Sequence, residues 1–502
     1  MSELPEAVGV IGAGTMGAGI AQLACLAGFE TYLHDPFPEE LERGGERVHR
    51  GLLKGAERDR WTEQEAEEAE RRLVLAESID DLYRCELVIE AAPEQLDLKR
   101  ELFEHVSDVV PQKAILATNT SSILVTSIAS AAIHPQHVVG MHFFNPPVLM
   151  GLLEVVRAEQ TADHALETAR AVGEKMGKHV IVVEDGPGFL VNRCGRPFGG
   201  EALRLLQEGV ASVEQVDRVC RLGGGFRMGP FELMDLVGID VGFHVAKSFD
   251  EQSFGEPRWR PNPLQAKMVA AGRLGRKTDR GWYDYSGDGP YRPEDPKPLE
   301  PGGGDGRHVA IHGESPLAQE LRERARAAGF DVRGEDPELV IDCTRSGAGE
   351  GATAVLCADR SLATHGQPEA CGFHLLPPLH QSQLVELTRL PTSDPETCDA
   401  AESFFGSCGF HHEWVGDGPG LVLGRIVCQL VNEAAFAVGE GVGSAGDVDA
   451  GVTLGLNHPR GPVEWGRQIG FPQALSAIDG LFDELHDPRY RAAPLLRRGA
   501  LA

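Results

Sequence analysis

The sequence lacks any apolar run that approaches the roughly 20 residues needed to span a membrane, so we expect no membrane helix. No basic stretch precedes its first apolar segment, AVGVI, which argues against a secretory signal. Positive charge is scarce: 47 Lys and Arg residues stand against 76 Asp and Glu residues, giving a net charge of −29 at pH 7. An acidic protein repels polyanions, so neither nucleic acid nor an anionic membrane surface is expected as a partner.

Cysteine motifs are also missing. The ten cysteines show no CxxC or other spacing typical of a metal site or a disulfide framework. We therefore expect no metal, reduced thiols and a cytoplasmic location. What is present is the composition of a globular chain, 42% hydrophobic and 25% charged. Its 502 residues are enough for three or four folded units of about 100–200 residues each.

The first motif is a glycine-rich turn between a strand and a helix. The strand-like run 7–11 leads directly into Gly12, Gly14 and Gly17, and the next strand-like run ends at Asp35. In a dinucleotide-binding fold such glycines allow a tight turn, close approach of a pyrophosphate and close helix–strand packing. A carboxylate at the distance of Asp35 takes the ribose hydroxyls. Because no arginine lies near Asp35 in the sequence to receive a 2′-phosphate, NAD is favoured over NADP.

Three further apolar runs, at 87–91, 114–118 and 137–141, alternate with helix-like stretches. This rhythm predicts an α/β fold with a mainly parallel, doubly wound, Rossmann-like sheet, whose ligands bind beyond the carboxyl ends of the strands. Two polar clusters follow the second and third of these runs, NTSS at 119–122 and HFFN at 142–145. We expect both clusters at the ligand-binding edge.

Residues 39–76 are heavily charged and are predicted to form a helical pair that projects from the sheet. Within it, Lys54 and Arg58 are four residues apart and would share one helix face. Two interpretations remain open for them: an ordinary solvated charged face, or a pair of cations that binds an anionic ligand.

The second half of the chain repeats the first in reduced form. The Gly-Phe pair at 28–29 recurs 301 residues later, the ELVIE run at 86–90 recurs in altered form 252 residues later, and from His142 onward the offset is a constant 232. A constant offset over about a hundred residues indicates an internal duplication. The fall from 301 to 252 implies that the second copy lacks the charged helical pair.

Polar groups, rather than packing residues, are lost from the second copy. His374 and Glu386 survive, but the glycine turn becomes GESP at 313–316, and the matches to Asn145 and Asn192 are lost. The pattern indicates a structural half.

These observations divide the chain into five parts. We expect a Rossmann-like domain at 1–185 that contains the helical pair, a helical domain at 186–285, a Pro- and Gly-rich linker at 286–306, a degenerate Rossmann-like domain at 307–415 and a second helical domain at 416–502.

The motifs above, together with EAAPEQLDLK, DGPGFLVNR, MGPFEL and GRKT followed by GWYDY, resemble the 3-hydroxyacyl-CoA dehydrogenase family in their order and spacing, densely over 7–285 and weakly beyond. The two-copy layout is similar to that of bacterial two-module enzymes acting on 3-hydroxybutyryl-CoA or 3-hydroxyadipyl-CoA. The resemblance implies NAD-dependent oxidation of (3S)-3-hydroxyacyl-CoA to 3-oxoacyl-CoA, in the breakdown of fatty acids or phenylacetate.

The same resemblance implies roles for individual residues. His142 is the catalytic base, Glu154 orients it, and Ser121 and Asn192 bind the substrate. A neutral imidazole can take the hydroxyl proton while hydride leaves the same carbon. The implied cofactor-binding residues are Gly12, Gly14, Thr15, Met16, Gly17, Asp35, Glu94, Lys99, Asn119, Ser121, Asn145 and Lys277. Lys54 and Arg58 fall where some members of the family contact CoA phosphate.

One active site per chain is therefore predicted, with the second helical domain packed on the first as subunits pack in one-copy dimers of the family. The chain would then be a monomer with an internal pseudo-dimer, or a homodimer. Two alternatives remain. One is a relative acting on a smaller hydroxy acid, such as a sugar-acid dehydrogenase, which has no need of CoA-facing helices. The other is a non-catalytic structural protein built on a dehydrogenase.

Overall fold

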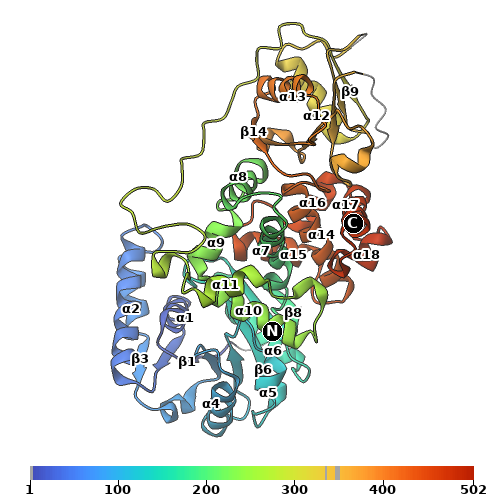
Figure 1. Cartoon of the computed structure of the whole chain (residues 1–502). Helices are drawn as coiled ribbons and strands as arrows, with labels where there is room; N and C mark the ends of the chain where they lie inside the picture. Colours follow the sequence, from blue (N-terminus) through green and yellow to red (C-terminus); the bar gives the residue numbers. More distant parts are fainter. Residues whose placement is uncertain (1–3, 334–335, 345–350, 502) are drawn as a thin grey trace. The chain divides into compact units, whose positions relative to one another are not determined.

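The computed structural model describes residues 4–333, 336–344 and 351–501, and its contacts divide the chain into two compact units (Figure 1). The first unit comprises Met1–Arg193 with Glu440–Leu456, and the second comprises Cys194–Gly439 with Asn457–Ala502. In the described ranges, no helix has the length and apolar character that crossing a membrane requires.

An eight-stranded sheet forms the centre of the first unit, in the order β3-β2-β1-β4-β5-β6-β7-β8. Its strands are β1 (Ala7–Ile11), β2 (Glu30–His34), β3 (Leu73–Ala76), β4 (Leu87–Glu90), β5 (Ile115–Thr118), β6 (Val138–Phe143), β7 (Leu152–Arg157) and β8 (His179–Glu184). The first six strands in this spatial order are parallel, whereas β7 is antiparallel to β6 and parallel to β8. The predicted parallel, doubly wound α/β sheet is confirmed; β3, β7 and β8 were not predicted.

Helices complete the first unit. They cover the faces of the sheet, which is why its central strands are continuously apolar. The helices are α1 (Thr15–Leu26), α2 (Pro38–Ala56), α3 (Glu63–Glu70), α4 (Leu96–Val109), α5 (Val125–Ala129) and α6 (Asp163–Lys175). The central strands β1, β4, β5 and β6 are buried along their whole length, as strands of a parallel sheet are when both faces are covered.

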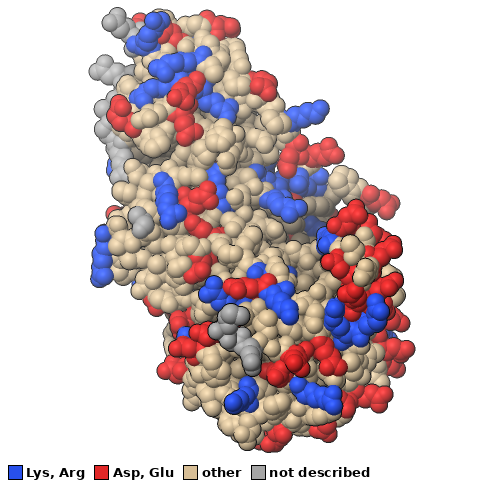
Figure 2. All heavy atoms as spheres, turned by 180° about the vertical axis from the view of Figure 1, so that it is seen from behind, with Lys and Arg blue, Asp and Glu red and all other residues tan. Residues whose placement is uncertain are grey.

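The charged segment differs from its prediction in two respects. Its helical pair, α2 and α3, ends at Glu70, and the final residues 73–76 form the edge strand β3 instead. Arg58 lies beyond the last helical residue of α2, Ala56, so the two cations do not share a helix face. Figure 2 shows acidic side chains gathered beside basic ones at the right edge of the view, where α2 and α3 lie.

A helix from the second repeat belongs to the first unit. Helix α15 (Ala445–Leu456) packs on β7 and β8. The chain leading into it is fixed by an ion pair of 2.7 Å between Arg193 Nη2 and Glu440 Oε2, and by a hydrogen bond of 3.0 Å from Glu184 N to Val442 O. The contacts therefore group this helix with the first sheet rather than with the second helical domain.

The second unit holds a smaller sheet in the order β14-β13-β12-β11-β10-β9. Its strands are β9 (Val309–His312), β10 (Leu339–Asp342), β11 (Thr353–Leu356), β12 (Cys371–His374), β13 (Leu384–Arg389) and β14 (His411–Trp414). Among the described residues, pairing on the outer side of β9 is reduced to one bridge between His308 and Asp331. The predicted reduced repeat is confirmed.

The second unit also contains helices of both repeats. Those of the first repeat are α7 (Val191–Gln207), most of which lies in this unit, α8 (Val213–Gly224), α9 (Pro230–Val237), α10 (Ile239–Gln252) and α11 (Pro263–Ala270). Those of the second repeat are α12 (Pro316–Ala327), α13 (Pro395–Ser407), α14 (Leu423–Gly439), α16 (Pro462–Ile469), α17 (Phe471–Leu485) and α18 (Pro494–Arg497). Of these helices, α8, α12 and α13 pack on the second sheet.

Helix α8 is the counterpart of α15, and it packs on β13, the counterpart of β7. Gln383 N donates to Leu222 O at 2.8 Å, and Arg218 Nη1 lies 2.7 Å from Glu413 Oε2. Each repeat thus contributes one helix, α8 or α15, to the sheet of the other repeat.

The two helical domains also meet within the second unit, as predicted. Arg258 of the first pairs with Glu433 of the second at 2.6 Å, and the counterparts of these residues, Arg489 and Glu201, approach to 3.9 Å. Arg425 adds a bond of 2.9 Å to Glu201. These charges are almost fully buried, so each depends on its partner.

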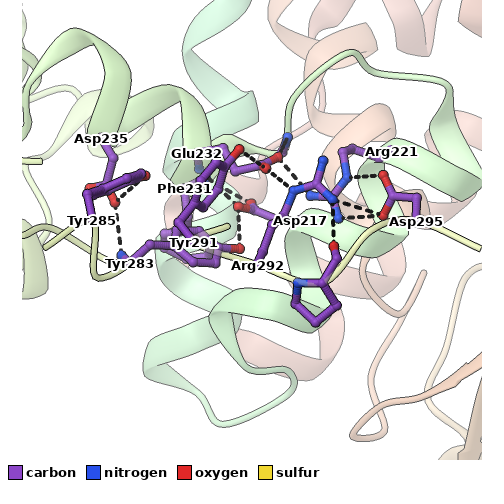
Figure 3. Close-up of polar contacts among 12 residues, drawn as sticks. Asp217, Arg221, Phe231, Glu232, Asp235, Tyr283, Tyr285, Tyr291, Arg292 and Asp295 are labelled. Atoms are coloured by element: carbon purple, nitrogen blue, oxygen red, sulfur yellow. Dashed lines mark hydrogen bonds and ion pairs between the residues drawn. The ribbon is translucent and has the colours of Figure 1, made fainter. Parts of the chain in front are cut away.

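The predicted linker has no helix or strand over 286–306, but it is anchored (Figure 3). Arg221 binds Asp295 through two nitrogens at 2.9 Å each, and Arg221 Nη1 lies 2.7 Å from Glu232 Oε2. Glu232 Oε1 in turn accepts hydrogen bonds from Tyr291 at 2.8 Å and from Arg292 at 2.5 Å. The first half of the linker is therefore held against α8 and α9.

Candidate active site

Two neighbouring strands bring His142 and Glu154 together. The antiparallel pairing of β6 with β7 sets these residues directly opposite each other, and His142 Nδ1 lies 2.7 Å from Glu154 Oε2. Both are buried, with exposed fractions of 5% and 0%. Because a carboxylate only accepts hydrogen bonds, Nδ1 carries the proton of the neutral ring. Nε2 is then left as the basic nitrogen.

Backbone groups at the start of α7 hold the carboxylate in place. Glu154 Oε1 accepts hydrogen bonds from Leu190 N at 3.1 Å and Val191 N at 3.0 Å. The imidazole is confined by Phe144 and Phe189, whose ring centres lie 4.5 Å and 5.7 Å from its own. The histidine is thus held in one orientation by a fully satisfied carboxylate and by packing.

Ser121 and Asn192, far apart in the sequence, are brought together in the first unit. Asn192 Nδ2 donates to Ser121 O at 3.4 Å. Asn119 Oδ1 accepts from Phe143 N at 2.8 Å, which ties the end of β5 to the end of β6. Asn145 is exposed directly after β6. The predicted polar clusters therefore lie at the same edge of the sheet.

Glu94 organises the loop that carries Ser121. Its Oε1 accepts from Thr120 Oγ1 at 2.5 Å and from the backbone N–H groups of Ser121 and Ser122 at 3.0 Å. Burial acts to raise the pKa of Glu94, but the ammonium of Lys99 and these hydrogen bonds outweigh it and lower the pKa. The side chain is therefore an ionised anchor of the loop that carries Ser121.

Lys99 is buried, with 1% exposed, between two carboxylates. Its Nζ lies 2.6 Å from Glu90 Oε1 and 3.4 Å from Glu94 Oε2, and Glu90 Oε2 also accepts from Thr118 Oγ1 at 2.7 Å. Glu90 was not among the predicted residues, although it lies at the end of a predicted strand. Lys99 thus supports Glu94 from below the loop.

The glycine turn has the form that a pyrophosphate requires. A Cβ at Gly17 would lie 1.7 Å from Gly12 O, so the turn and α1 can close only on glycine. A Cβ at Gly14 would meet nothing within 4 Å, and no side chain caps the N-terminus of α1. The first N–H groups of this helix remain available for an anion. Thr15 and Met16 begin the helix at this turn.

Asp35 lies beside the same turn, with Oδ2 2.9 Å from Ala13 N and Oδ1 3.1 Å from Phe37 N. An arginine distant in the sequence does reach this turn, because Arg47 of α2 donates to Ala13 O at 2.8 Å. It also lies 3.5 Å from Glu40, which offsets its charge. The sequence could not reveal this contact, since it depends on how α2 packs on α1.

Three predicted residues remain, one in the second unit and two in the first. Lys277 belongs to the second unit, where Nζ pairs with Asp240 at 2.6 Å. Lys54 and Arg58 are exposed in the first unit.

The second repeat preserves the strand pairing and the backbone hydrogen bonds of this arrangement, but not the close contact between histidine and glutamate. His374 and Glu386 are again opposed across two strands, and Glu386 accepts from Val422 N at 2.7 Å and Leu423 N at 3.1 Å. The distance from His374 Nδ1 to Glu386 Oε1 is 3.4 Å, longer than in the first repeat.

Comparison with known families agrees with this geometry. The NAD-binding domain model of 3-hydroxyacyl-CoA dehydrogenase matches residues 7–186, and the C-terminal domain model matches 188–285 and again 420–502. The chain belongs to the 3-hydroxyacyl-CoA dehydrogenase family. It is an NAD-dependent oxidoreductase of acyl-CoA metabolism, as the motifs implied.

Relatives of this family member include both one-repeat and two-repeat proteins. A 3-hydroxyadipyl-CoA dehydrogenase of Escherichia coli is 34% identical over 99% of this chain and 98% of its own length. A 3-hydroxybutyryl-CoA dehydrogenase of Bradyrhizobium diazoefficiens is 42% identical over 57% of this chain and 98% of its own. The crystal structure of a 3-hydroxybutyryl-CoA dehydrogenase from Escherichia coli K12 covers 99% of both chains, with a TM-score of 0.85 and 33% identity.

Proposed function

We propose that this chain oxidises (3S)-3-hydroxyacyl-CoA to 3-oxoacyl-CoA at one active site, with His142 as the catalytic base. The 3-hydroxyl proton passes to Nε2 of His142 while the carbon loses a hydride. NAD, when bound, accepts that hydride. In the reverse direction the imidazolium returns the proton to the 3-oxo oxygen. Such a positioned base contributes about 10²–10⁴ in rate.

The observation that carries this proposal is the 2.7 Å contact between His142 Nδ1 and Glu154 Oε2. It directs the proton of neutral imidazole to Nδ1 and the lone pair to Nε2. The buried negative charge of Glu154 also stabilises the imidazolium that forms during oxidation. Ser121 and Asn192, joined at 3.4 Å, are suited to bind the 3-oxygen or the thioester of the substrate.

The cofactor is proposed to lie along the edge of the first sheet. The open N-terminus of α1 at Gly14 would receive the pyrophosphate, and Asp35 the ribose hydroxyls. Glu94, Asn119 and Asn145 would face the nicotinamide end. The chemistry of these donors fits NAD, because it offers helix N–H groups to the phosphates and a carboxylate to a ribose.

For the CoA part of the substrate we propose a groove of about 540 Å³ in the first unit. Its apolar lining includes Trp61 and Leu149, and its cations are Arg60 and Lys175. An indole beside two cations suits the adenine and phosphates of CoA. Lys54 and Arg58 precede Arg60 closely in the chain and would extend the same cationic region. Sequence reasoning missed Arg60 and Lys175 because they come from elements far apart in the chain.

We further propose a short acyl chain, in keeping with the two-repeat relatives, and a chain that works as a monomer whose two repeats replace two subunits. All ten cysteines are free, which suits the proposed cytoplasmic location. A panel of acyl-CoA esters with and without a terminal carboxylate would define the acyl specificity.

The direct test follows NADH absorbance during reduction of acetoacetyl-CoA. We expect the His142→Ala variant to lose about 10²–10⁴ in kcat. The matched control is His374→Ala in the second repeat, which should retain the wild-type rate. No NADH oxidation by the wild type would exclude the acyl-CoA activity, and full activity of the His142→Ala variant would exclude its role as base.

A further inference from the structure

The second repeat contains a cavity of about 260 Å³ in the second unit. It lies at the carboxyl ends of β10, β11 and β12, the edge at which ligands bind in sheets of this kind. Its floor is buried and includes Leu375, Cys428 and Ala477, whereas Pro472 and Gln473 of α17 form an exposed rim. The cavity is therefore open at one side and apolar at depth, as small-molecule sites are.

A dinucleotide does not fit this cavity. Helix α12 is capped by Ser315, whose Oγ accepts from Ala318 N at 3.3 Å, and its first residue, Pro316, has no N–H group. The helix N-terminus that would hold a pyrophosphate is thus already satisfied. In the first repeat the corresponding position is Gly14, where the helix is uncapped.

The charges of the described lining disfavour other anions as well. Among the described residues that line the cavity there is no lysine or arginine, and the one charged side chain is the carboxylate of Asp359, whose Oδ1 lies 3.8 Å from Arg360 Nε. Within this described lining, a carboxylate, a phosphate or a CoA ester would meet the negative charge of Asp359 in a half-buried site. The lining therefore favours a small occupant that is uncharged or cationic.

The polar groups of the cavity favour an uncharged amide. His374, with 3% exposed, lines the buried floor, and its Nδ1 is turned toward Glu386 Oε1 at 3.4 Å without a hydrogen bond to any described residue, which leaves Nε2 as the ring nitrogen for a ligand. Thr344 and Gln473 add hydrogen-bonding groups nearer the rim. A flat ring would pack against the leucines and prolines, while an amide would bind the imidazole.

Repeat-to-repeat matches point to the same ligand class. His374 and Pro377 correspond to His142 and Asn145, on the side of the first cleft where the nicotinamide ring is proposed to lie, and Leu317 corresponds to Met16 at the glycine turn. This step rests on the cofactor placement proposed above. We propose that the second repeat retains a separate binding site for a small, uncharged aromatic amide of nicotinamide size.

Equilibrium dialysis with nicotinamide, performed on the full chain saturated with NADH, tests this site. We expect one saturable nicotinamide site per chain and at least about tenfold weaker binding of nicotinate, which differs only in its carboxylate. The Ala477→Phe variant should fill the cavity and lose nicotinamide binding by about tenfold or more while keeping NADH oxidation. Gln473→Trp, at the exposed rim, gives a second block that does not disturb the core.

Three results would overturn the proposal: no nicotinamide binding beside NADH, equal binding of nicotinate, or unchanged binding in both cavity variants. The His142→Ala variant should bind nicotinamide as the wild type does. Failure of the proposed enzymatic function would appear separately, as absence of NADH oxidation. Nicotinamide binding by the cavity variants could still be measured and interpreted in that case.

Discussion

The ring of His374 lies against Gly424 so closely that a Cβ at position 424 would be 2.4 Å from Nε2 of the imidazole. The counterpart of Gly424 in the first repeat is Asn192, whose amide contacts Ser121 O. The histidine of the second repeat therefore occupies space in which the first repeat holds the side chain of Asn192. Restoring that asparagine is incompatible with the present position of His374.

Replacing Gly424 by asparagine should consequently destabilise the chain without creating a second active site. We expect a loss of about 1–3 kcal/mol in the free energy of unfolding, the usual cost of overpacking a core. Urea denaturation would measure it. In a double-mutant cycle with His374→Ala, most of the loss should be recovered; an additive result would contradict the steric explanation.

NADH should bind with a stoichiometry of one per chain. Ser315 caps α12 and Pro316 removes an N–H group, so the second repeat has no anion site to match that of the first. Equilibrium titration followed by NADH fluorescence would count the sites. Two equivalents per chain would refute the assignment.

Removing the charge of Glu154 should reduce catalysis but not cofactor binding. In Glu154→Gln the shape of the side chain is kept, while the stabilisation of the imidazolium is lost. We expect kcat to fall by about 10²-fold or more with little change in the KM for NADH. Glu386→Gln is the matched control in the second repeat and should have wild-type kinetics. Equal effects of the two substitutions would argue against a single active site.

The proposed CoA groove predicts a selective change in substrate affinity. Arg60→Ala and Lys175→Ala should each raise the KM for acetoacetyl-CoA by about tenfold and weaken its dependence on ionic strength. Arg71→Ala removes an exposed arginine that does not line the groove and serves as the control. If all three variants behaved alike, the groove would not be the CoA site.

Asp217 should give stability a pH dependence. Burial raises its pKa from 3.8 to about 7, so the folded chain holds a proton that the unfolded chain releases. The free energy of unfolding should therefore decrease as pH rises from about 4 to about 7. Denaturation curves across this range should show a shallower decline for Asp217→Asn. An unchanged slope in the variant would show that Asp217 does not titrate there.

Much of the first sheet was predictable because its central strands are buried on both faces and read as short apolar runs. β7 escaped prediction although LLEVV is apolar, because nothing local shows that its direction reverses beside β6. The pairing of His142 with Glu154 depends on that reversal. Proximity in the sequence suggested it, but only the cross-strand register establishes it.

Other parts of the site depend on tertiary packing and had no local signal. Arg47 reaches the glycine turn through the packing of α2 on α1, and Lys175 meets Trp61 at a groove between distant segments. By contrast, the closed helix N-terminus of the second repeat was readable. Ser followed by Pro is a common start of a helix, and it occupies positions 315 and 316.

The exchange of α8 and α15 between the two sheets affects how the enzyme responds to dilution and how its second repeat evolves. In a dimer of separate subunits, a helix contributed by the partner is lost when the protein concentration falls and the dimer dissociates. Here the helix belongs to the same chain, so its local concentration is fixed. The strand carrying Glu154 is supported by α15, a helix encoded in the second repeat. Mutations in the second repeat can therefore impair the site of the first, which keeps the second repeat under selection.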